Sequence, residues 1–148
     1  MTITIDVQYA TVSRDVPDRR KIRKWAKTCL DDINKDVELT IRVVDEAECT
    51  ELNRNWRGKN KATNVLSFPA GDTRLVPELL GDIVICAPVI AREAGKQHKQ
   101  PDAHWAHMVI HGILHLLGYD HENDKDAQTM ESFEIKKLQS LNYPNPYE

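Results

Sequence analysis

Residues 37–56 read VELTIRVVDEAECTELNRNW, which joins a strand pattern directly to a helix pattern. Residues 37–43 alternate apolar and polar side chains, as expected for a β-strand with one buried face. Asp45, followed three residues later by Glu48, predicts a capping box that starts a short helix ending near Trp56. A strand that leads straight into a helix is typical of domains that mix the two kinds of element.

The rest of the chain continues this mixture of strands and helices. Alternating or continuous apolar residues predict three more strands, over residues 3–9, 65–68 and 79–86. Start and stop signals predict helices from Pro17 and Asp18, from Pro88, over about 102–117 and over about 123–141. The last helix is expected to bury an apolar stripe made of Ala127, Met130, Phe133, Leu138 and Leu141. Residues 72–78 are expected to form a loop. We therefore expect one α+β or α/β-like domain over residues 1–148, built on a mixed sheet of about four strands.

The composition is that of a soluble globular protein, with 41% hydrophobic and 29% charged residues. A length of 148 residues allows a real hydrophobic core without support from disulfides or metals. The formal net charge of -3 does not by itself favour a nucleic-acid-binding protein. Residues 54–61 nevertheless carry four basic residues and no acid, and for such a local bias the simplest interpretation is a solvated face.

Cysteine and hydropathy patterns limit where the protein is expected to work. Cys29, Cys49 and Cys86 are far apart in sequence and form no CxxC pair, so they predict reduced, buried thiols and no disulfide framework or thiolate metal site. Residues 1–6 lack the pattern of a signal peptide, and no apolar stretch reaches the ~18 residues that a membrane span needs. We expect a cytoplasmic protein without a membrane partner.

Five of the six histidines lie between residues 104 and 121, and the most informative stretch is HGILHLLGYDH, residues 111–121. His111 and His115 are four residues apart on a predicted helix, so both imidazoles project from one face and can chelate a single ion. Gly118 can take the left-handed conformation that ends a helix and turns the chain back, which brings His121 round as a third ligand. Three imidazoles leave a coordination position open for water, as in catalytic zinc sites. The sequence thus predicts one metal site per chain, on a helix and the turn that follows it.

Two alternatives remain open for this histidine cluster. His107 lies one turn before His111, so it either replaces His121 as the third ligand or packs behind the site. The ion is expected to be Zn²⁺, although imidazole also suits nickel or another divalent ion.

The spacing matches the zinc-protease signature H-E-x-x-H-x-x-G-x-x-H except that Gly112 stands where the protease has its glutamate. Because that glutamate is the general base, a metallopeptidase is not favoured.

Three segments together resemble the YbeY family of bacterial endoribonucleases. They are NRNWRGKNKATNVLSFP (53–69), LGDIVIC (80–86) and HWAHMVIHGILHLLGYDHE (104–122), and the similarity extends over nearly the whole chain. The resemblance implies zinc on His111, His115 and His121, an essential Arg57, and cleavage of single-stranded RNA. It further implies a cytoplasmic role in ribosomal RNA processing, including maturation of the 16S rRNA 3′ end, and in ribosome quality control. RNA, the ribosome and ribosomal proteins are then the expected partners.

The residues themselves are compatible with chemistry on a phosphodiester. A metal ion could lower the pKa of its water to about 7 and polarise a phosphoryl oxygen. Arg57 offers a planar fork that matches phosphate oxygens, although a plain surface residue after a helix is the alternative. Lys59 and Lys61 could guide the RNA backbone. Asp120 and Glu122 flank His121 and are the nearest candidates for the proton acceptor, with Asp120 preferred.

Two further expectations concern a neighbouring carboxylate and a rival function. Asp82 is expected either to support an imidazole from behind or to be a plain polar residue in a strand. The rival function is a ribosome-associated RNA-binding factor in which the zinc is structural.

Overall fold

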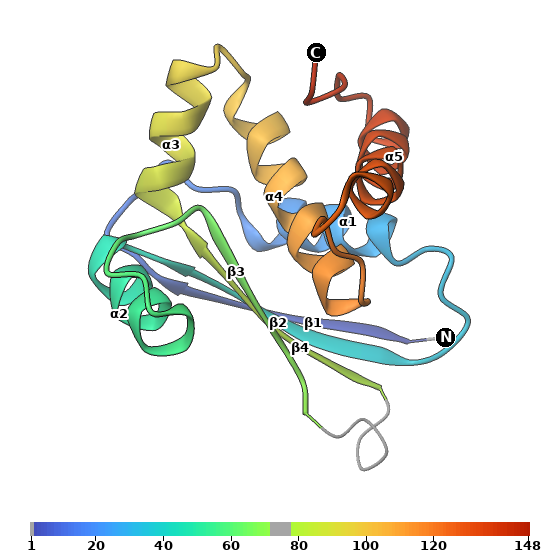
Figure 1. The fold of residues 1–148 in the computed structure, drawn as a ribbon, viewed down its shortest axis with the longest axis horizontal. Coiled ribbons are helices and arrows are strands. Elements are labelled where there is room, and N and C mark those ends of the chain that lie inside the picture. Colours follow the sequence, from blue (N-terminus) through green and yellow to red (C-terminus); the bar gives the residue numbers. More distant parts are fainter. Residues whose placement is uncertain (1, 72–77) are drawn as a thin grey trace.

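A four-stranded sheet with helices packed mainly on one face forms the framework of the protein (Figure 1). The computed structural model describes residues 2–71 and 78–148, so the loop expected at 72–78 lies almost entirely outside the described residues. The strands are β1 (Ile3–Ala10), β2 (Val37–Val44), β3 (Val65–Pro69) and β4 (Leu79–Cys86). The helices are α1 (Arg19–Cys29), α2 (Glu46–Arg57), α3 (Ala87–Lys96), α4 (Pro101–Leu116) and α5 (Asp124–Ser140). The expected mixture of strands and helices is thus confirmed.

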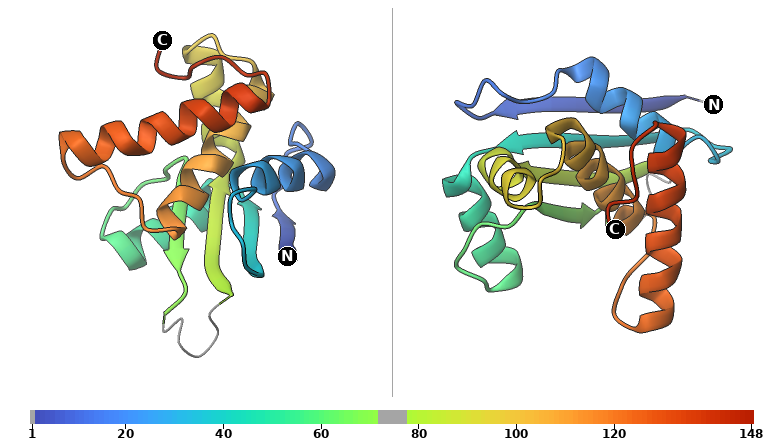
Figure 2. Two further views of the ribbon diagram at one scale, coloured as in Figure 1. Left: turned by 90° about the vertical axis from the view of Figure 1, so that its right-hand side faces the viewer. Right: turned by 90° about the horizontal axis from the view of Figure 1, so that it is seen from above.

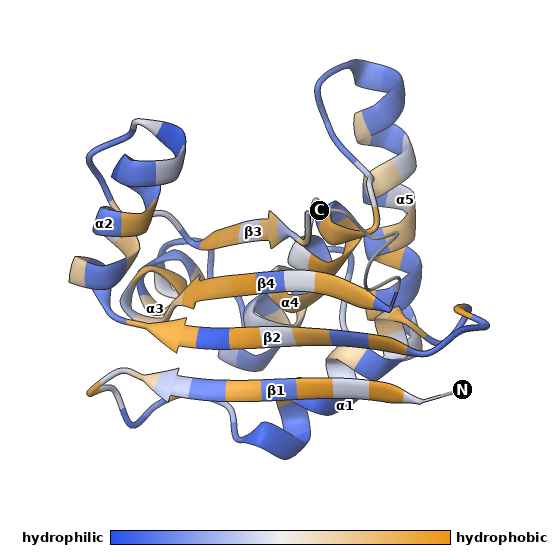
Figure 3. Ribbon diagram, turned by 90° about the horizontal axis from the view of Figure 1, so that it is seen from below, coloured by the Kyte–Doolittle hydropathy of each residue, from blue (hydrophilic) through white to orange (hydrophobic). Residues whose placement is uncertain are grey.

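The sheet is mixed, as the sequence predicted, with the strand order β1-β2-β4-β3. β1 and β4 each run parallel to β2, whereas β3 pairs antiparallel with β4 and forms one edge. Figure 3 looks onto the face opposite the main helices, where the strands lie in front of them. Because β3 is an edge strand, its outer side borders the cleft described below.

Helix α4 is the central helix of the domain and lies between α3 and α5 above the sheet (Figure 2). Eleven of its sixteen residues are buried, because it contacts α1, α3, α5, β3 and β4. A helix that is apolar nearly all round is expected only at such a position. The last two turns of α4 carry His111 and His115, so the predicted metal ligands stand on a rigid support.

Gly112 allows α4 to lie close to the sheet. A Cβ atom at this position would lie 3.0 Å from Ile83 Cγ2 and 3.3 Å from the hydroxyl of Ser67. That hydroxyl donates a hydrogen bond to the Gly112 carbonyl at 3.0 Å, which ties α4 to the edge strand. The glycine that departs from the protease signature therefore has a packing reason.

The capping box predicted at Asp45 and Glu48 is wrong, although α2 does begin after Asp45. The Asp45 carboxylate accepts hydrogen bonds from the Thr11 hydroxyl and from the Val12 amide, at 3.0 Å from the latter. The carboxylate of Glu48 pairs with Arg42 on β2 at 2.6 Å. Partners from other parts of the chain have replaced the local capping bonds, because both carboxylates face neighbouring elements.

Two further expectations concern cysteines and membranes. Cys29, Cys49 and Cys86 are buried free thiols, as predicted. Within the described residues, none of the helices has the length and apolar character that a membrane crossing requires.

Candidate metal centre

The side chains of His111, His115 and His121 converge at the end of α4. One nitrogen from each imidazole lies within 4.8 Å of the other two, and the Nε2 atoms of His111 and His115 are 3.2 Å apart. The helix ends at Leu116, and Gly118 takes a φ of +100°, which turns the chain so that His121 faces back toward the helix. The geometry that the spacing predicted is therefore present.

This arrangement of donors suits a divalent metal ion. Burial lowers the pKa of His115, and the neighbouring His111 and His121 lower it further, which favours the neutral imidazole that binds metals. His121 is exposed, and His111 and His115 are half-buried. Three neutral imidazoles on a partly open site match a centre that keeps one position for water.

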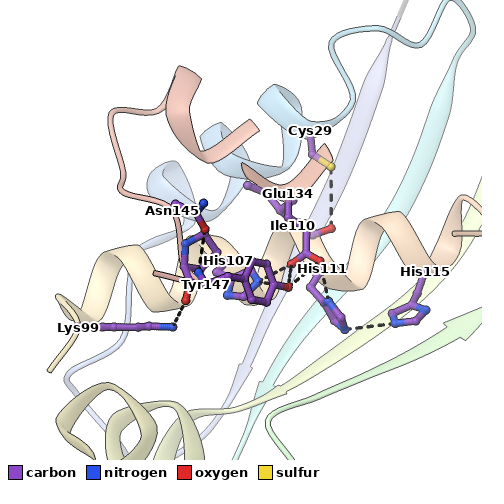
Figure 4. A network of polar contacts seen from close by, with 10 residues as sticks. Cys29, Lys99, His107, Ile110, His111, His115, Glu134, Asn145 and Tyr147 are labelled. Carbon is purple, nitrogen blue, oxygen red and sulfur yellow. Dashed lines mark hydrogen bonds and ion pairs between the residues drawn. The ribbon is translucent and has the colours of Figure 1, made fainter. Parts of the chain in front are cut away.

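A buried carboxylate, Glu134 of α5, supports the histidines from behind (Figure 4). It is 1% exposed, accepts a hydrogen bond from His107 Nε2, and lies 3.5 Å from His111 Nδ1. Burial alone would raise the pKa of Glu134, but the contacts with His107 and His111 outweigh it and bring the pKa to about 2. Glu134 is therefore a carboxylate anion next to the ring nitrogen of His111 that faces away from His115.

This position of Glu134 suggests how His111 is oriented. A metal-bound imidazole usually donates its second N–H to a carboxylate or a carbonyl, which fixes the ring and its tautomer. His111 directs Nε2 toward His115 and Nδ1 toward Glu134, so its two nitrogens suit these two tasks. His107 is buried and contacts Glu134, and these two form a second group of possible ligands with His111.

The three histidines open into a cleft of about 1430 Å³ that runs along the edge strand β3. Arg57 and Asp120 also line this cleft. Arg57 is the last residue of α2, and Gly58 ends the helix with a left-handed conformation at φ +71°. The Asp120 carboxylate accepts a hydrogen bond from the His121 amide at 2.7 Å, so it is held at the same turn. The cleft thus brings the histidines together with a cation and a carboxylate.

Comparison with known proteins places the chain in a family. The model of the family described as Endoribonuclease YbeY matches residues 6–142. The chain belongs to the YbeY family. Proteins named Endoribonuclease YbeY from Pseudomonas syringae pv. syringae (strain B728a) and from Nitrosococcus oceani are 54% and 50% identical to it. These alignments cover 98% and 100% of this chain, and 88% and 99% of the two relatives.

A solved structure has a similar fold. The solution structure of TM1509 from Thermotoga maritima is 27% identical and superposes with a TM-score of 0.68, over 93% of this chain and 89% of that one. The family membership confirms the expectation of an endoribonuclease. It does not favour the RNA-binding factor with a structural zinc, nor the metallopeptidase.

The remaining site residues predicted for this YbeY-family chain lie at different distances from the cleft. Lys59 and Lys61 are exposed on the loop after α2 and are not among the residues that line it. Buried Asn53 holds this loop, because its side-chain amide donates to the Lys61 carbonyl at 2.8 Å. Asp82 is exposed on β4 and lines the cleft, whereas the buried carboxylate beside the imidazoles is Glu134.

The sequence contained a signal for Glu134 that the prediction did not use. Glu134 lies four residues after Met130 and four before Leu138, inside the stripe expected to be buried. An acidic residue in a buried stripe needs a partner, because an isolated buried charge is very unfavourable. Here the partners are histidines of the neighbouring helix α4.

Proposed function

We propose that this chain is a single-strand-specific endoribonuclease that depends on a divalent ion held by His111, His115 and His121. The ion is Zn²⁺, one per chain. The enzyme acts in the bacterial cytoplasm in ribosomal RNA processing, including 16S rRNA 3′ end maturation, and in ribosome quality control, in contact with the ribosome or its proteins. The observation that carries this proposal is the convergence of the three imidazoles in one cleft with Arg57, in a member of the YbeY family.

The charges of the cleft suit an anionic substrate. A bound divalent ion supplies a Lewis acid and an acidified water at neutral pH. Neutral imidazoles leave the positive charge of such an ion uncompensated at the open side of the site, which favours a phosphodiester over an uncharged bond. Arg57 can place two N–H groups on the phosphate oxygens and stabilise the negative charge that develops on them.

Three other residues have secondary roles in the proposal. Asp120 is the candidate proton acceptor, because its carboxylate lines the cleft at the His121 turn. Lys59 and Lys61 attract the RNA backbone from outside the cleft, as exposed lysines do for polyanions. Their contribution is therefore expected in binding and in its salt dependence, with little effect on the cleavage step.

A metal analysis combined with an RNA cleavage assay tests the proposal. The purified full-length protein is expected to contain about one zinc per chain and to cleave a single-stranded RNA but not the same RNA in a duplex. Chelation should remove both metal and cleavage, and His115→Ala should lose both. His98→Ala is the control for a lost imidazole, because His98 is exposed and lies in the loop after α3. Cleavage that survives complete removal of the metal would exclude this mechanism.

The RNA product distinguishes two forms of the reaction. A 2′,3′-cyclic phosphate end would show that the ribose 2′-hydroxyl attacks, whereas a linear phosphate end from the first turnover would show that water attacks.

Elemental analysis of protein from cells grown without added metal would separate zinc from nickel or copper, which imidazole ligands also suit.

A further inference from the structure

Trp56 has a large aromatic side chain that is exposed to solvent and lines the cleft. It is 70% exposed, whereas Trp25 and Trp105 are 2% and 3% exposed. Single exposed apolar side chains are common on protein surfaces and need no explanation by themselves. Trp56 differs because it lines the same cleft as His111, His115 and His121.

The ring of Trp56 is held in place although it is exposed. Its centroid lies 5.9 Å from that of Phe68 on β3, with 67° between the ring planes, so the two rings meet edge to face. Trp56 also belongs to the last turn of α2, which fixes its backbone. An aromatic ring that is both exposed and oriented loses little conformational entropy when a flat ligand stacks on it.

The neighbourhood of Trp56 indicates the chemistry of that ligand. The next residue is Arg57, and Arg54, Lys59 and Lys61 lie within the same turn and loop, so the surface attracts a polyanion. The cleft of about 1430 Å³ exceeds the roughly 300–1,000 Å³ of typical small-molecule sites, so it has room for several units of a polymer. A polymer that combines phosphates with flat aromatic groups is a nucleic acid.

We propose that Trp56 is a stacking platform for an unpaired base of the RNA that lies in the metal cleft. This inference rests on the proposed function and adds a base-binding subsite to it. In a duplex the faces of the bases are covered by their neighbours, whereas in a single strand they are free to stack on aromatic side chains. Trp56 therefore gives a physical reason for a preference for single strands that does not depend on base sequence.

Tryptophan fluorescence of the full-length, metal-containing protein gives a direct test. Trp56 is the only one of the three tryptophans that is exposed, so an added oligonucleotide reaches its ring alone. A cleavage-resistant single strand, made of 2′-O-methyl phosphorothioate nucleotides, should quench the fluorescence with saturation. The same strand annealed to its complement should quench much less. Saturable binding without any change in fluorescence would overturn the proposal.

Substitutions separate stacking from simple apolar contact. Trp56→Ala should weaken binding by roughly 5- to 150-fold, the range that corresponds to loss of one base–aromatic stack. Trp56→Phe should keep most of the affinity, whereas Trp56→Leu, which is apolar but has no π face, should behave like alanine. Equal affinities for the phenylalanine, leucine and alanine variants would refute stacking as the interaction. The melting temperature should fall only slightly, because the ring is mostly exposed although it contacts Phe68.

An abasic oligonucleotide links the tryptophan to a base and completes the test. Removing the stacked base should weaken binding to the wild type but not to Trp56→Ala, which is the pattern of two groups that contact each other. If the base contributes equally to both proteins, Trp56 is not its platform. These outcomes do not depend on turnover. A protein that binds RNA and stacks a base on Trp56 but never cleaves the RNA would refute the proposed function alone. A protein that cleaves RNA but whose Trp56→Ala variant binds RNA normally would refute this subsite alone.

Discussion

The hydroxyl of Tyr147 donates to the carboxylate of Glu134, with 3.0 Å between the hydroxyl oxygen and each carboxylate oxygen. Burial raises the pKa of Tyr147, and the negative charge of Glu134 raises it further, so the hydroxyl remains a donor. Lys99 holds the same end of the chain by donating to the Pro146 carbonyl at 3.0 Å (Figure 4). The last residues of the chain are thus connected, through the carboxylate of Glu134, to His111, one of the predicted metal ligands.

Glu134→Gln is expected to weaken metal binding by roughly 10- to 100-fold, the usual effect of losing a group that hydrogen-bonds to a ligand. The amide keeps the size of the side chain but removes the negative charge next to His111 Nδ1. Competition with a chelator measures the affinity, and the visible spectrum of the cobalt-substituted protein reports on ligand geometry. Glu131→Gln, which removes a charge from the same helix, is the control. Equal affinities of the two variants would show that Glu134 only supports the fold.

Tyr147→Phe tests how far the end of the chain matters to the metal site. The variant loses one hydrogen bond to Glu134, while His107 still contacts the same carboxylate. We expect a smaller loss of metal affinity than in Glu134→Gln, in the same competition assay. Tyr143→Phe is the control, because Tyr143 packs edge to face on Trp25 instead. A larger loss in Tyr147→Phe than in Glu134→Gln would show that Tyr147 does not act on the metal site through Glu134.

Lys137 connects α5 to the end of α1, and this link predicts a dependence of stability on pH. The buried Lys137 ammonium lies 2.6 Å from Asp31 and 3.0 Å from Asp32. Burial alone would lower the pKa of Lys137, but its bonds to Asp31 and Asp32 outweigh this and raise it. The hydrogen bond from Lys137, followed by that from Asp31, lowers the pKa of Asp32.

The directions of these pKa shifts determine the pH range over which the link stabilises the protein. The contribution of Asp32 is complete above its unfolded pKa of about 3.9 and is lost as pH falls through the lower folded value. The contribution of Lys137 is complete below its unfolded pKa of about 10.4 and is lost as pH rises through the raised value. Urea unfolding should therefore show Lys137→Met less stable than the wild type at pH 7, with the difference shrinking toward pH 3. Exposed Lys136→Met is the control, and a difference that stays constant with pH would refute the link.

Much of the fold was predictable because its signals are local. Pro88 opens α3, Asp18 caps α1 through its bond to the Lys21 amide, and Gly118 turns the chain after α4, each through its own backbone chemistry. What sequence reasoning missed depends on partners far along the chain. Glu134 and His107 are 27 residues apart, and Lys137 and Asp31 are 106 residues apart.

The same distinction explains why the capping box was wrong and why no sequence pattern shows the contact between Gly112 and the sheet. The capping box failed because Thr11, which is 34 residues from Asp45, and Arg42 on β2 bind the two carboxylates. The need for glycine at 112 depends on Ile83 of β4, and no local pattern shows how closely a helix approaches a sheet. The convergence of the histidines was predictable because a helical repeat and one turn suffice to produce it, whereas their ligand role remains a prediction.

Gly112→Ala should destabilise the protein although alanine is the better helix former. The gain in helix propensity is about 1 kcal/mol, while forcing a methyl group against the buried Ile83 costs ~1–3 kcal/mol. Gly95→Ala is the matched control, since nothing lies within 4 Å of a Cβ there and only the propensity changes. Urea unfolding should place Gly95→Ala at or above the wild type and Gly112→Ala below it. If both variants gain stability, the sheet can move away and glycine is not required for packing.

Arg57→Ala should lose cleavage while it keeps the metal and the fold. Arg57 is exposed at the end of α2, so its removal leaves no cavity and no buried charge, and the urea midpoint should not change. Losing one charge-stabilising donor in a transition state costs ~2.7–4 kcal/mol by analogy with an oxyanion hole, or a decrease in kcat of about 100- to 1000-fold. Arg57→Lys should restore only part of the rate, because a point charge cannot form the two parallel bonds of the guanidinium.

Arg54→Ala is the matched control, since Arg54 lies one turn earlier and is not among the cleft residues. Single-turnover cleavage at saturating RNA separates the chemical step from binding. If Arg57→Ala cleaves at the wild-type rate, Arg57 only attracts the substrate. If the Arg57→Ala protein loses its metal, Arg57 belongs to the structure of the site.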